Sequence, residues 1–220
     1  MRLVKKRKLE EKYPRYDLQI ANTHNFIAER IVVHNTNCRI GLIKTEDGMQ
    51  FMAGSHKVRR KQFDDKENIT LYWQPLDEKL IALLEALSNG VHDAIVFGEI
   101  FGPGVQDLDY GQTKKAFRVF DITVNGHYLD WEEVAAICKH HGVPTVPLLY
   151  KGVFSPIIVE EYTYGKTTVS DQVKSKFKDR EGCVVTPLTE QFSDVLGGRM
   201  ILKSVSADYR DRKGAEDIGE

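Results

Sequence analysis

Three adjacent residues, His34, Asn35 and Thr36, carry side chains that could cut one peptide bond and form another. An asparagine amide can attack its own C-terminal peptide bond and form a succinimide, which cuts the chain. His34 is placed to assist, because an imidazole can polarise the carbonyl or protonate the leaving amine. The Thr36 hydroxyl could accept an acyl group as the branch point of a transesterification. An ordinary strand could end in the same three residues, so the interpretation depends on the sequence around them.

The residues before this junction predict a small all-β segment. Two short stretches, 16–20 and 25–35, have the alternating, β-branched pattern of strands, and residues 21–23 supply a turn between them. This segment is too short to bury a core of its own. We therefore expect it to pair its edges with another chain or to pack on the residues after the junction.

The residues after the junction predict an α+β fold of mostly antiparallel strands with interspersed helices. Strand patterns occupy residues 38–44, 49–55, 94–102, 117–124, 182–187 and 199–205. A stripe of Leu80, Leu83, Leu84 and Leu87 predicts an amphipathic helix over 76–89, which Gly90 ends. A second helix is expected over 130–141, capped by Asp130. Residues 57–61 and 63–68 are expected to form loops.

The block from Tyr16 to Asn35 resembles the C-terminal splicing segment of inteins, the elements that excise themselves from proteins. The resemblance implies that Asn35 cyclises, that His34 assists, and that Thr36 begins the flanking protein. It also implies that Asp17 and His24 assist the earlier steps. The sequence departs from the family at Glu29-Arg30, where many members have glycine as the second residue, and this affects the expected turn.

Charge and length suggest how such a segment would work. Residues 1–35 hold eight Lys/Arg against four Asp/Glu, a net of +4, whereas residues 36–220 hold 23 against 28, a net of −5. Because Met1 precedes the junction by only 35 residues, we expect a split intein whose N-terminal half is a separate, acidic chain. Nucleic-acid or membrane contact and a solvated tail are the alternatives for the basic arm. The predicted domains are 1–35 and 36–220.

Residues 36–220 resemble the phage-type RNA ligase family of covalent nucleotidyltransferases. Thr36-Asn37 matches the end of the motif Lys-x-His/Asp-Gly-Thr-Asn, so the nucleophilic lysine would belong to the missing N-terminal half. Later blocks of the family are matched in order by FGEIFG (97–102), FRVFDI (117–122), REGCVV (180–185) and ILKSV (201–205). The resemblance implies an antiparallel-sheet-rich, ATP-grasp-like nucleotidyltransferase core that uses ATP and Mg²⁺.

The same resemblance assigns cofactor contacts to Asn37, Glu99, Phe120, Asp121, Glu181 and Lys203. Glu99 would contact the ATP ribose, and Phe120 would stack on adenine. Asp121 would lie near the reacting lysine or the metal, and Glu181 would be a ligand of the metal or of its water. Lys203 would neutralise the α-phosphate during formation of a lysine-AMP intermediate. Related ligases often carry a second lysine two positions after Lys203, where this chain has Val205.

Other candidate sites have simpler explanations. Lys44-Thr45-Glu46-Asp47-Gly48 is similar to the nucleophile motif, but it has one residue too many and comes after Thr36-Asn37, so a hairpin turn is expected. Arg59 and Arg60 could bind substrate phosphates or belong to a solvated loop. Cys138, His140 and His141 end a helix whose dipole favours cations there, and this position favours a structural role over metal binding.

Composition excludes few classes of function. The chain is 41% hydrophobic and 29% charged, and no apolar run approaches a membrane span or a secretory signal, so a cytoplasmic location is the default expectation. Its three cysteines fit a reducing compartment. The sequence thus predicts a trans-splicing precursor of an ATP-dependent ligase that acts on RNA or DNA ends and is inactive alone as a ligase. The alternatives are an unspliced nucleotide- or nucleic-acid-binding module and an inactive gene fragment.

Overall fold

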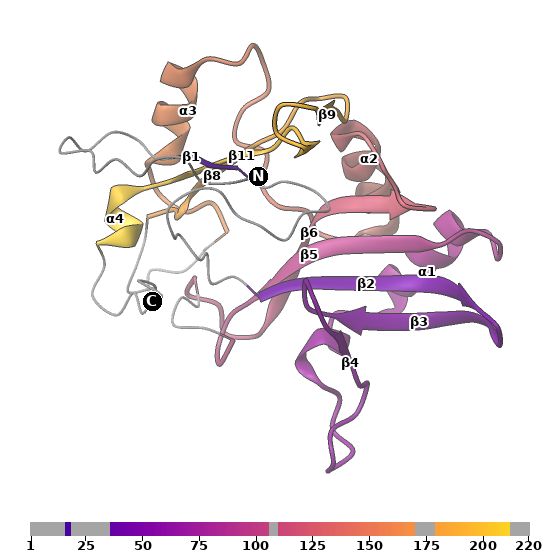
Figure 1. The fold of residues 1–220 in the computed structure, drawn as a ribbon. Coiled ribbons are helices and arrows are strands. Elements are labelled where there is room, and N and C mark those ends of the chain that lie inside the picture. The colour runs from indigo at the N-terminus through magenta and orange to yellow at the C-terminus, as the bar shows by residue number, and fades with distance from the viewer. Residues whose placement is uncertain (1–15, 19–35, 106–109, 170–178, 212–220) are drawn as a thin grey trace, which may run out of the picture.

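A six-stranded antiparallel sheet dominates the computed structural model, which describes residues 16–18, 36–105, 110–169 and 179–211 (Figure 1). Its strand order is β4-β3-β2-β5-β6-β7. The strands are β2 (Thr36–Thr45), β3 (Gly48–Gly54), β4 (Arg59–Arg60), β5 (Ala94–Phe101), β6 (Ala116–Val124) and β7 (His127–Tyr128). Together with the few helices, this sheet confirms the predicted α+β class.

Turn residues set the register of the sheet as the sequence predicts. Gly48 has φ +101° where β2 turns into β3. Asn125 and Gly126 have φ values of +50° and +80°, the left-handed pair that a tight hairpin requires between β6 and β7. These turns place consecutive strands side by side.

Two helices, α1 (Glu78–Ser88) and α2 (Trp131–His141), cover one face of the large sheet. The Asp77 side chain accepts a hydrogen bond from the Leu80 backbone N–H, 2.9 Å, which starts α1 one residue after Asp77. The predicted leucine stripe is buried at Leu80, Leu83 and Leu84. These leucines pack with sheet residues into one core, whose fully buried members include Ile40, Val96, Val119, Ile122 and Val134.

A second, three-stranded sheet has the order β1-β11-β8, with β1 (Tyr16–Leu18), β11 (Leu202–Val205) and β8 (Gly182–Val185). It packs against α3 (Pro156–Thr163). A short hairpin of β9 (Phe192–Ser193) and β10 (Gly198–Arg199) lies between β8 and β11 in the chain, and α4 (Ala207–Arg210) comes after them. The predicted turn at 21–23 and strand at 25–35 fall outside the described residues.

Several elements differ from the sequence predictions. The basic stretch 57–61, expected as loop, contains the edge strand β4. The expected strand 199–205 is interrupted at Met200 and Ile201, so that β10 and β11 join different sheets. Neither α3 nor α4 was predicted, because eight and four residues are too few to show a helical period. Within the described residues, no helix has the length and apolar character needed to cross a membrane.

Candidate functional site

The candidate site begins on the sheet face opposite α1 and α2, which we call the site face. Cys38, Ile40 and Val96 are fully buried on the helix side, so the alternating residues of the same strands point to the site face. Strand pairing arranges these alternating residues in two rows across β2, β5 and β6. One row is Asn37, Glu99 and Arg118, and the next is Arg39, Phe97 and Asp121.

A β-bulge places Phe120 beside Asp121 on the site face. Val119 and Ile122 are both fully buried in the helix-side core, although they are three positions apart and a regular strand would put them on opposite faces. The register shift between Phe97 and Gly98 accommodates this spacing, because one extra residue on β6 restores the alternation. Both intervening side chains, Phe120 and Asp121, therefore turn away from the helices.

Asn37 carries an unsatisfied buried group. Its Oδ1 atom is buried and has no hydrogen-bond partner among the described residues. An unpaired buried acceptor is costly, and such groups often bind a ligand or water. Asn37 comes directly after Thr36, the first residue of β2, which pairs with Ile100. Of the other predicted splicing residues, His24, His34 and Asn35 lie outside the described residues, and for Asp17 only the backbone of β1 is described.

Tyr110 connects the predicted carboxylates Glu99 and Glu181, which come from different parts of the fold. Its hydroxyl donates a hydrogen bond to Glu181, and its ring packs edge-on against Phe101 with centroids 5.6 Å apart. Burial raises the pKa of Tyr110, and the negative charges of Glu181 and Glu99 raise it further. The Tyr110 hydroxyl thus holds Glu181, which precedes β8 of the small sheet, while its ring packs on Phe101 of β5 in the large sheet.

Lys203 lies on the central strand of the small sheet. The next residue, Ser204, accepts a 2.6 Å hydrogen bond from the Thr163 hydroxyl of α3 and is buried. By strand alternation, Lys203 then points to the sheet face opposite α3. Its neighbour in the register, Val184, is 59% exposed, so solvent reaches this face beside Lys203.

Val205, at the position where the resemblance implies a second lysine, is part of the apolar core. The side chain is 5% exposed and packs in an apolar cluster with Phe101, Tyr110 and Tyr209. This cluster joins the two sheets, since Phe101 belongs to β5 and Val205 to β11. A lysine at position 205 would put a charge among these rings.

Arg199 binds Asp121 through a network that the sequence did not reveal. Its guanidinium donates to both Asp121 oxygens, at 2.7 and 3.0 Å, and to both Glu190 oxygens, at 2.6 and 2.7 Å. It also stacks 3.6 Å above the centroid of the Tyr128 ring. An arginine after Gly-Gly gives no sequence signal for such a role. The network fixes the position of Asp121 and uses both of its carboxylate oxygens as hydrogen-bond acceptors.

Burial and pairing shift the pKa values in this network in defined directions. Burial raises the pKa of the Asp121 carboxyl, and hydrogen bonds and the positive charge of Arg199 oppose that rise. Burial alone would lower the pKa of Arg199, but its hydrogen bonds to Glu190 and Asp121 raise it. Arg199 is therefore a permanent cation, 8% exposed, between two carboxylates.

The described residues fit a nucleotide better than they fit a metal held by protein alone. Asn37 on β2 offers an unpaired amide oxygen, and Phe120 offers an aromatic ring on β6, with β5 between the two strands. Lys203 lies on the central strand of the second sheet. In contrast, no group of three or more His, Cys, Asp and Glu side chains among the described residues could hold a metal ion.

Two residues considered in the sequence have structural roles. The Lys44 backbone N–H donates to Asp93, 2.8 Å, near the end of β2, and the Glu46-Asp47 turn comes next, as the hairpin prediction required. Cys138 is fully buried in the core, where burial raises its pKa to about 11. Burial likewise raises the pKa of Cys38 to about 12, so neither thiol is activated.

Solved structures with a similar fold include several of one enzyme, Naegleria gruberi RNA ligase. A mutant of that ligase with ATP and Mn matches with a TM-score of 0.59 and 17% identity, over 82% of this chain and 49% of that chain. The same ligase with PPi matches with a TM-score of 0.57 and 18% identity, over 83% of this chain and 51% of that chain. This chain thus spans about half the length of the solved ligase.

Two curated relatives of this chain are DNA polymerases. DNA polymerase of Thermococcus sp. (strain GE8) is 28% identical over 196 residues, which is 80% of this chain and 10% of the polymerase. DNA polymerase of Thermococcus hydrothermalis is 27% identical over 180 residues, or 74% of this chain and 9% of the polymerase. The chain therefore spans about a tenth of each polymerase.

The family model described as RNA ligase matches residues 33–205, which include β2 to β11 and every site residue from Thr36 to Lys203. That match covers far more than half of the chain, and the fold agrees with it. The chain belongs to the RNA ligase family.

Proposed function

We propose that residues 36–220 form the C-terminal part of an ATP-dependent RNA ligase, which protein splicing at Asn35–Thr36 joins to the half that carries the reacting lysine. The observation that carries the ligase proposal is the site face. Four residues matched to the family's nucleotide contacts lie on neighbouring strands of that face: Asn37, Glu99, Phe120 and Asp121. The unpaired Oδ1 of Asn37 lies at the start of this group.

Each residue has a defined task in this proposal. The Asn37 amide oxygen accepts a hydrogen bond from the bound nucleotide, and the Phe120 ring stacks on the base. Glu99 accepts from the ribose, while Lys203 places a positive charge by the α-phosphate. ATP, when bound, supplies the AMP group that is transferred. Asp121 and Glu190 hold Arg199, and through it the β9–β10 hairpin, against the site face.

The splicing step is proposed from residues 16–36 of the sequence. The Thr36 hydroxyl takes the acyl group of the N-terminal half and releases that half's own nucleophile. The Asn35 side-chain nitrogen then attacks the Asn35 carbonyl carbon, the Asn35–Thr36 bond breaks, and His34 protonates the leaving Thr36 amine. The acyl group finally moves from the Thr36 oxygen to that amine, which forms a peptide bond. Splicing would thereby complete the motif that ends in Thr36-Asn37.

Mass spectrometry of this chain mixed with candidate N-terminal halves tests the splicing proposal. We expect loss of residues 1–35 and a larger joined product. The Asn35→Ala variant should stop C-terminal cleavage, because alanine has no amide nitrogen to attack the carbonyl. Persistence of the intact precursor with every candidate half would contradict the proposal.

Incubation with ATP labelled at the α-phosphate tests the ligase proposal separately. The chain alone should take up no covalent label, whereas the joined product should be labelled on a lysine upstream of Thr36. Labelling of this chain at Lys44 would contradict the assignment of the nucleophile. A Glu99→Gln variant of the joined product should lose most of its labelling, since the proposed ribose contact is weakened.

A second function, nucleotide binding without splicing, is favoured by one observation. β2 pairs with β3 on one side and with β5 on the other, so the site face exists within this chain. Equilibrium dialysis of the Asn35→Ala variant with ATP measures this directly. Binding that disappears in an Asn37→Leu variant would support it.

A further inference from the structure

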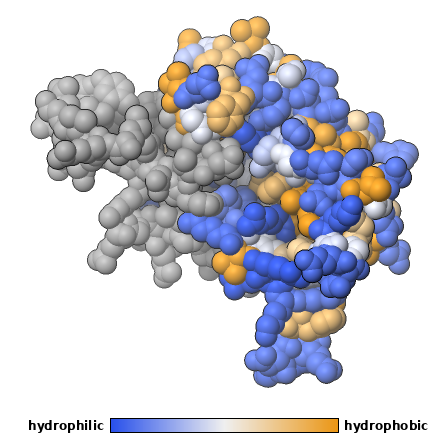
Figure 2. All heavy atoms as spheres, turned by 45° about the vertical axis from the view of Figure 1, so that its right-hand side comes forward, coloured by the Kyte–Doolittle hydropathy of each residue, from blue (hydrophilic) through white to orange (hydrophobic). Residues whose placement is uncertain are grey.

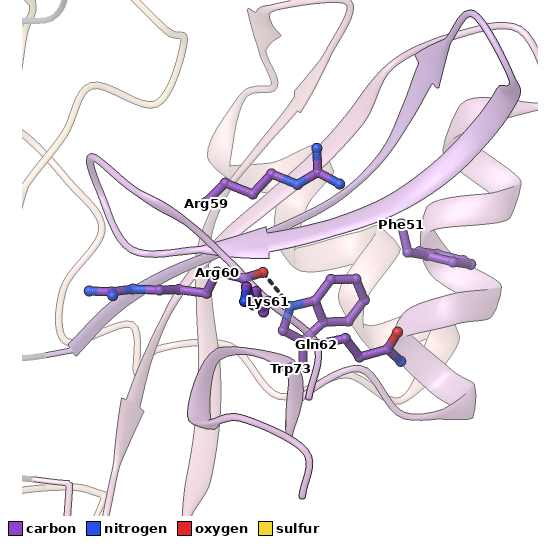
Figure 3. Close-up of a pocket in the computed structure, with 6 residues that line it drawn as sticks. All are labelled: Phe51, Arg59, Arg60, Lys61, Gln62 and Trp73. Carbon is purple, nitrogen blue, oxygen red and sulfur yellow. Dashed lines mark hydrogen bonds between the residues drawn. The ribbon is translucent and has the colours of Figure 1, made fainter. Parts of the chain in front are cut away.

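A pocket lies at the β4 edge of the large sheet, away from the residues matched to nucleotide contacts (Figure 3). Its cavity volume is about 440 Å³, which falls in the range of roughly 300–1,000 Å³ typical of ligand pockets. Six residues line it: Phe51, Arg59, Arg60, Lys61, Gln62 and Trp73. The lining therefore combines two aromatic rings with three cations.

Interactions between the lining residues hold the pocket in shape. The Trp73 indole N–H donates to the Arg60 carbonyl, 2.9 Å, which fixes the edge strand above the ring. Trp73 is 9% exposed and belongs to the main core, so the packing of the core fixes the position of its ring at the side of the pocket. The Arg60 guanidinium lies 5.5 Å from the centroid of the Tyr72 ring. Figure 3 shows Arg59 and Arg60 extending to different sides of β4.

The cations of the pocket are exposed and available to an anion. Arg59, Arg60 and Lys61 make no ion pair with any carboxylate of the described residues. The nearby Asp64 carboxylate instead accepts hydrogen bonds from the backbone N–H groups of Lys66 and Asn68, within its own turn. The projection that carries β4 is mostly hydrophilic in Figure 2.

Strand register connects this edge to the site face. Arg59 is paired with Gly54, Gly54 with Arg39, Arg39 with Phe97, and Phe97 with Asp121, so these five residues form one row across the sheet. A Cβ added at Gly54 would lie 2.3 Å from the Val58 carbonyl oxygen, which explains the glycine there. The row leaves Arg59 on the same face as Asp121, at the opposite end. Phe51 pairs instead with Leu42, and Arg60 with Ala53, both of the helix-side core, so the rings of the pocket lie on the other face and β4 carries cations on both faces.

We infer that the β4 edge binds a single-stranded segment of the polynucleotide substrate, with its phosphates on Arg59, Arg60 and Lys61 and one base in the pocket between Phe51 and Trp73. Cations beside aromatic rings are the usual combination for single strands, because phosphates meet the charges and every base can stack. An acidic peptide would use the charges but not the rings. This inference rests on the proposed ligase function and places the substrate strand around the β4 edge of the sheet, in contact with both faces.

Fluorescence anisotropy with the full chain tests the phosphate contacts. The probe is a fluorescein-labelled oligouridylate of about 12 nucleotides, within the usual range of single-strand site sizes. We expect Arg59→Gln to weaken binding about 3–10-fold and to reduce the slope of log affinity against log salt by about 1. Lys57→Gln is the matched control, since it removes one charge from the same exposed segment but does not line the pocket. Equal losses in both variants would overturn the inference.

Tryptophan fluorescence tests the base contact. The chain has two tryptophans, so Trp131→Phe leaves Trp73 as the sole reporter. The unlabelled oligouridylate should quench Trp73, and Phe51→Leu should weaken binding while circular dichroism stays unchanged. Oligoglutamate of similar length should neither quench Trp73 nor compete well for the oligonucleotide. Equal competition by oligoglutamate would overturn the inference in favour of an acidic protein partner.

The two proposals fail in different ways. A joined product that takes up label from ATP, but whose oligonucleotide affinity is insensitive to Arg59→Gln, overturns the inference and leaves the ligase proposal standing. A joined product that takes up no label, while the oligonucleotide binds and depends on Arg59, overturns the ligase proposal alone.

Discussion

Replacement of Arg199 should strongly destabilise the folded chain. Its side chain is 10% exposed and pairs with Asp121 and Glu190, whose side chains are 17% and 22% exposed. Arg199→Ala would leave two carboxylates largely buried without a cation. We expect a loss of about 3–5 kcal/mol in the free energy of unfolding at neutral pH, measured by urea titration.

The sign of the pH dependence can be worked out from Asp121. A carboxyl group whose folded-state pKa is raised contributes stability that is present below its unfolded pKa and lost as pH rises through the folded pKa. Without Arg199, burial and the negative charge of Glu190 both raise the pKa of Asp121 and no cation opposes them, so the deficit of Arg199→Ala should shrink as pH falls from 7 towards 4. Arg199→Lys keeps the charge but not the paired hydrogen bonds, so its loss should be intermediate. A deficit independent of pH would contradict this account.

The cysteines should differ in reactivity according to their burial. Cys38 and Cys138 are fully buried, and burial raises their pKa values to about 12 and about 11. Cys183 is partly exposed, although burial raises its pKa as well. Alkylation of the folded chain, followed by peptide mass spectrometry, should therefore modify Cys183 first. Faster modification of Cys38 would show that the β2 core is open in solution.

Gly182 allows β8 and β11 to approach closely, which makes the small sheet sensitive to a single methyl group. A Cβ at Gly182 would lie 1.8 Å from the Ser204 carbonyl oxygen, and the residue has φ +156°. Gly182→Ala should cost about 1–3 kcal/mol more than Gly90→Ala, because Gly90 also has positive φ but nothing within 4 Å. Thermal unfolding of both variants gives the comparison. Equal costs would mean that the strands separate without penalty.

Elements with a strong local pattern could be predicted from the sequence, and those fixed by distant contacts could not. The leucine stripe and Asp77 predict α1 to within two residues at its start, because they act within one helix. The turns at Gly48 and Asn125-Gly126 likewise predict their hairpins. The bulge that turns Phe120 and Asp121 to the same face depends on pairing with Phe97 and Gly98, so it becomes visible only once the strands are aligned.

The residues of the candidate site could likewise be predicted from the sequence only in part. The motif order placed Asn37, Glu99, Phe120 and Asp121 among the candidates, and the structure places all four on the site face. Arg199 and Tyr110 escaped sequence analysis because their roles arise from partners 78 and 71 residues away. The splicing residues before Thr36 stay predictions from sequence.

At the scale of the whole molecule, the two sheets depend on one apolar junction. Val205, Phe101, Tyr110 and Tyr209 form it, together with the hydrogen bond from Tyr110 to Glu181. Val205→Lys should destabilise the chain, because the ammonium group would lose its hydration among rings. Val195→Lys is the control, since Val195 is 95% exposed and its replacement should change the free energy of unfolding by less than about 0.5 kcal/mol. Urea titration of both variants distinguishes the two, and a neutral Val205→Lys would mean that the junction opens to solvent.

The large sheet ends on both sides in a strand of two residues, β4 and β7. A long, uncharged edge strand offers free backbone groups to the edges of other molecules, and short or charged edges prevent such stacking. The arginines of β4 therefore protect the protein from aggregation as well as offering charge to a ligand. Variants that neutralise both Arg59 and Arg60 should form oligomers more readily at high concentration. Light scattering should accompany every affinity measured on them, so that lost solubility is not mistaken for lost binding.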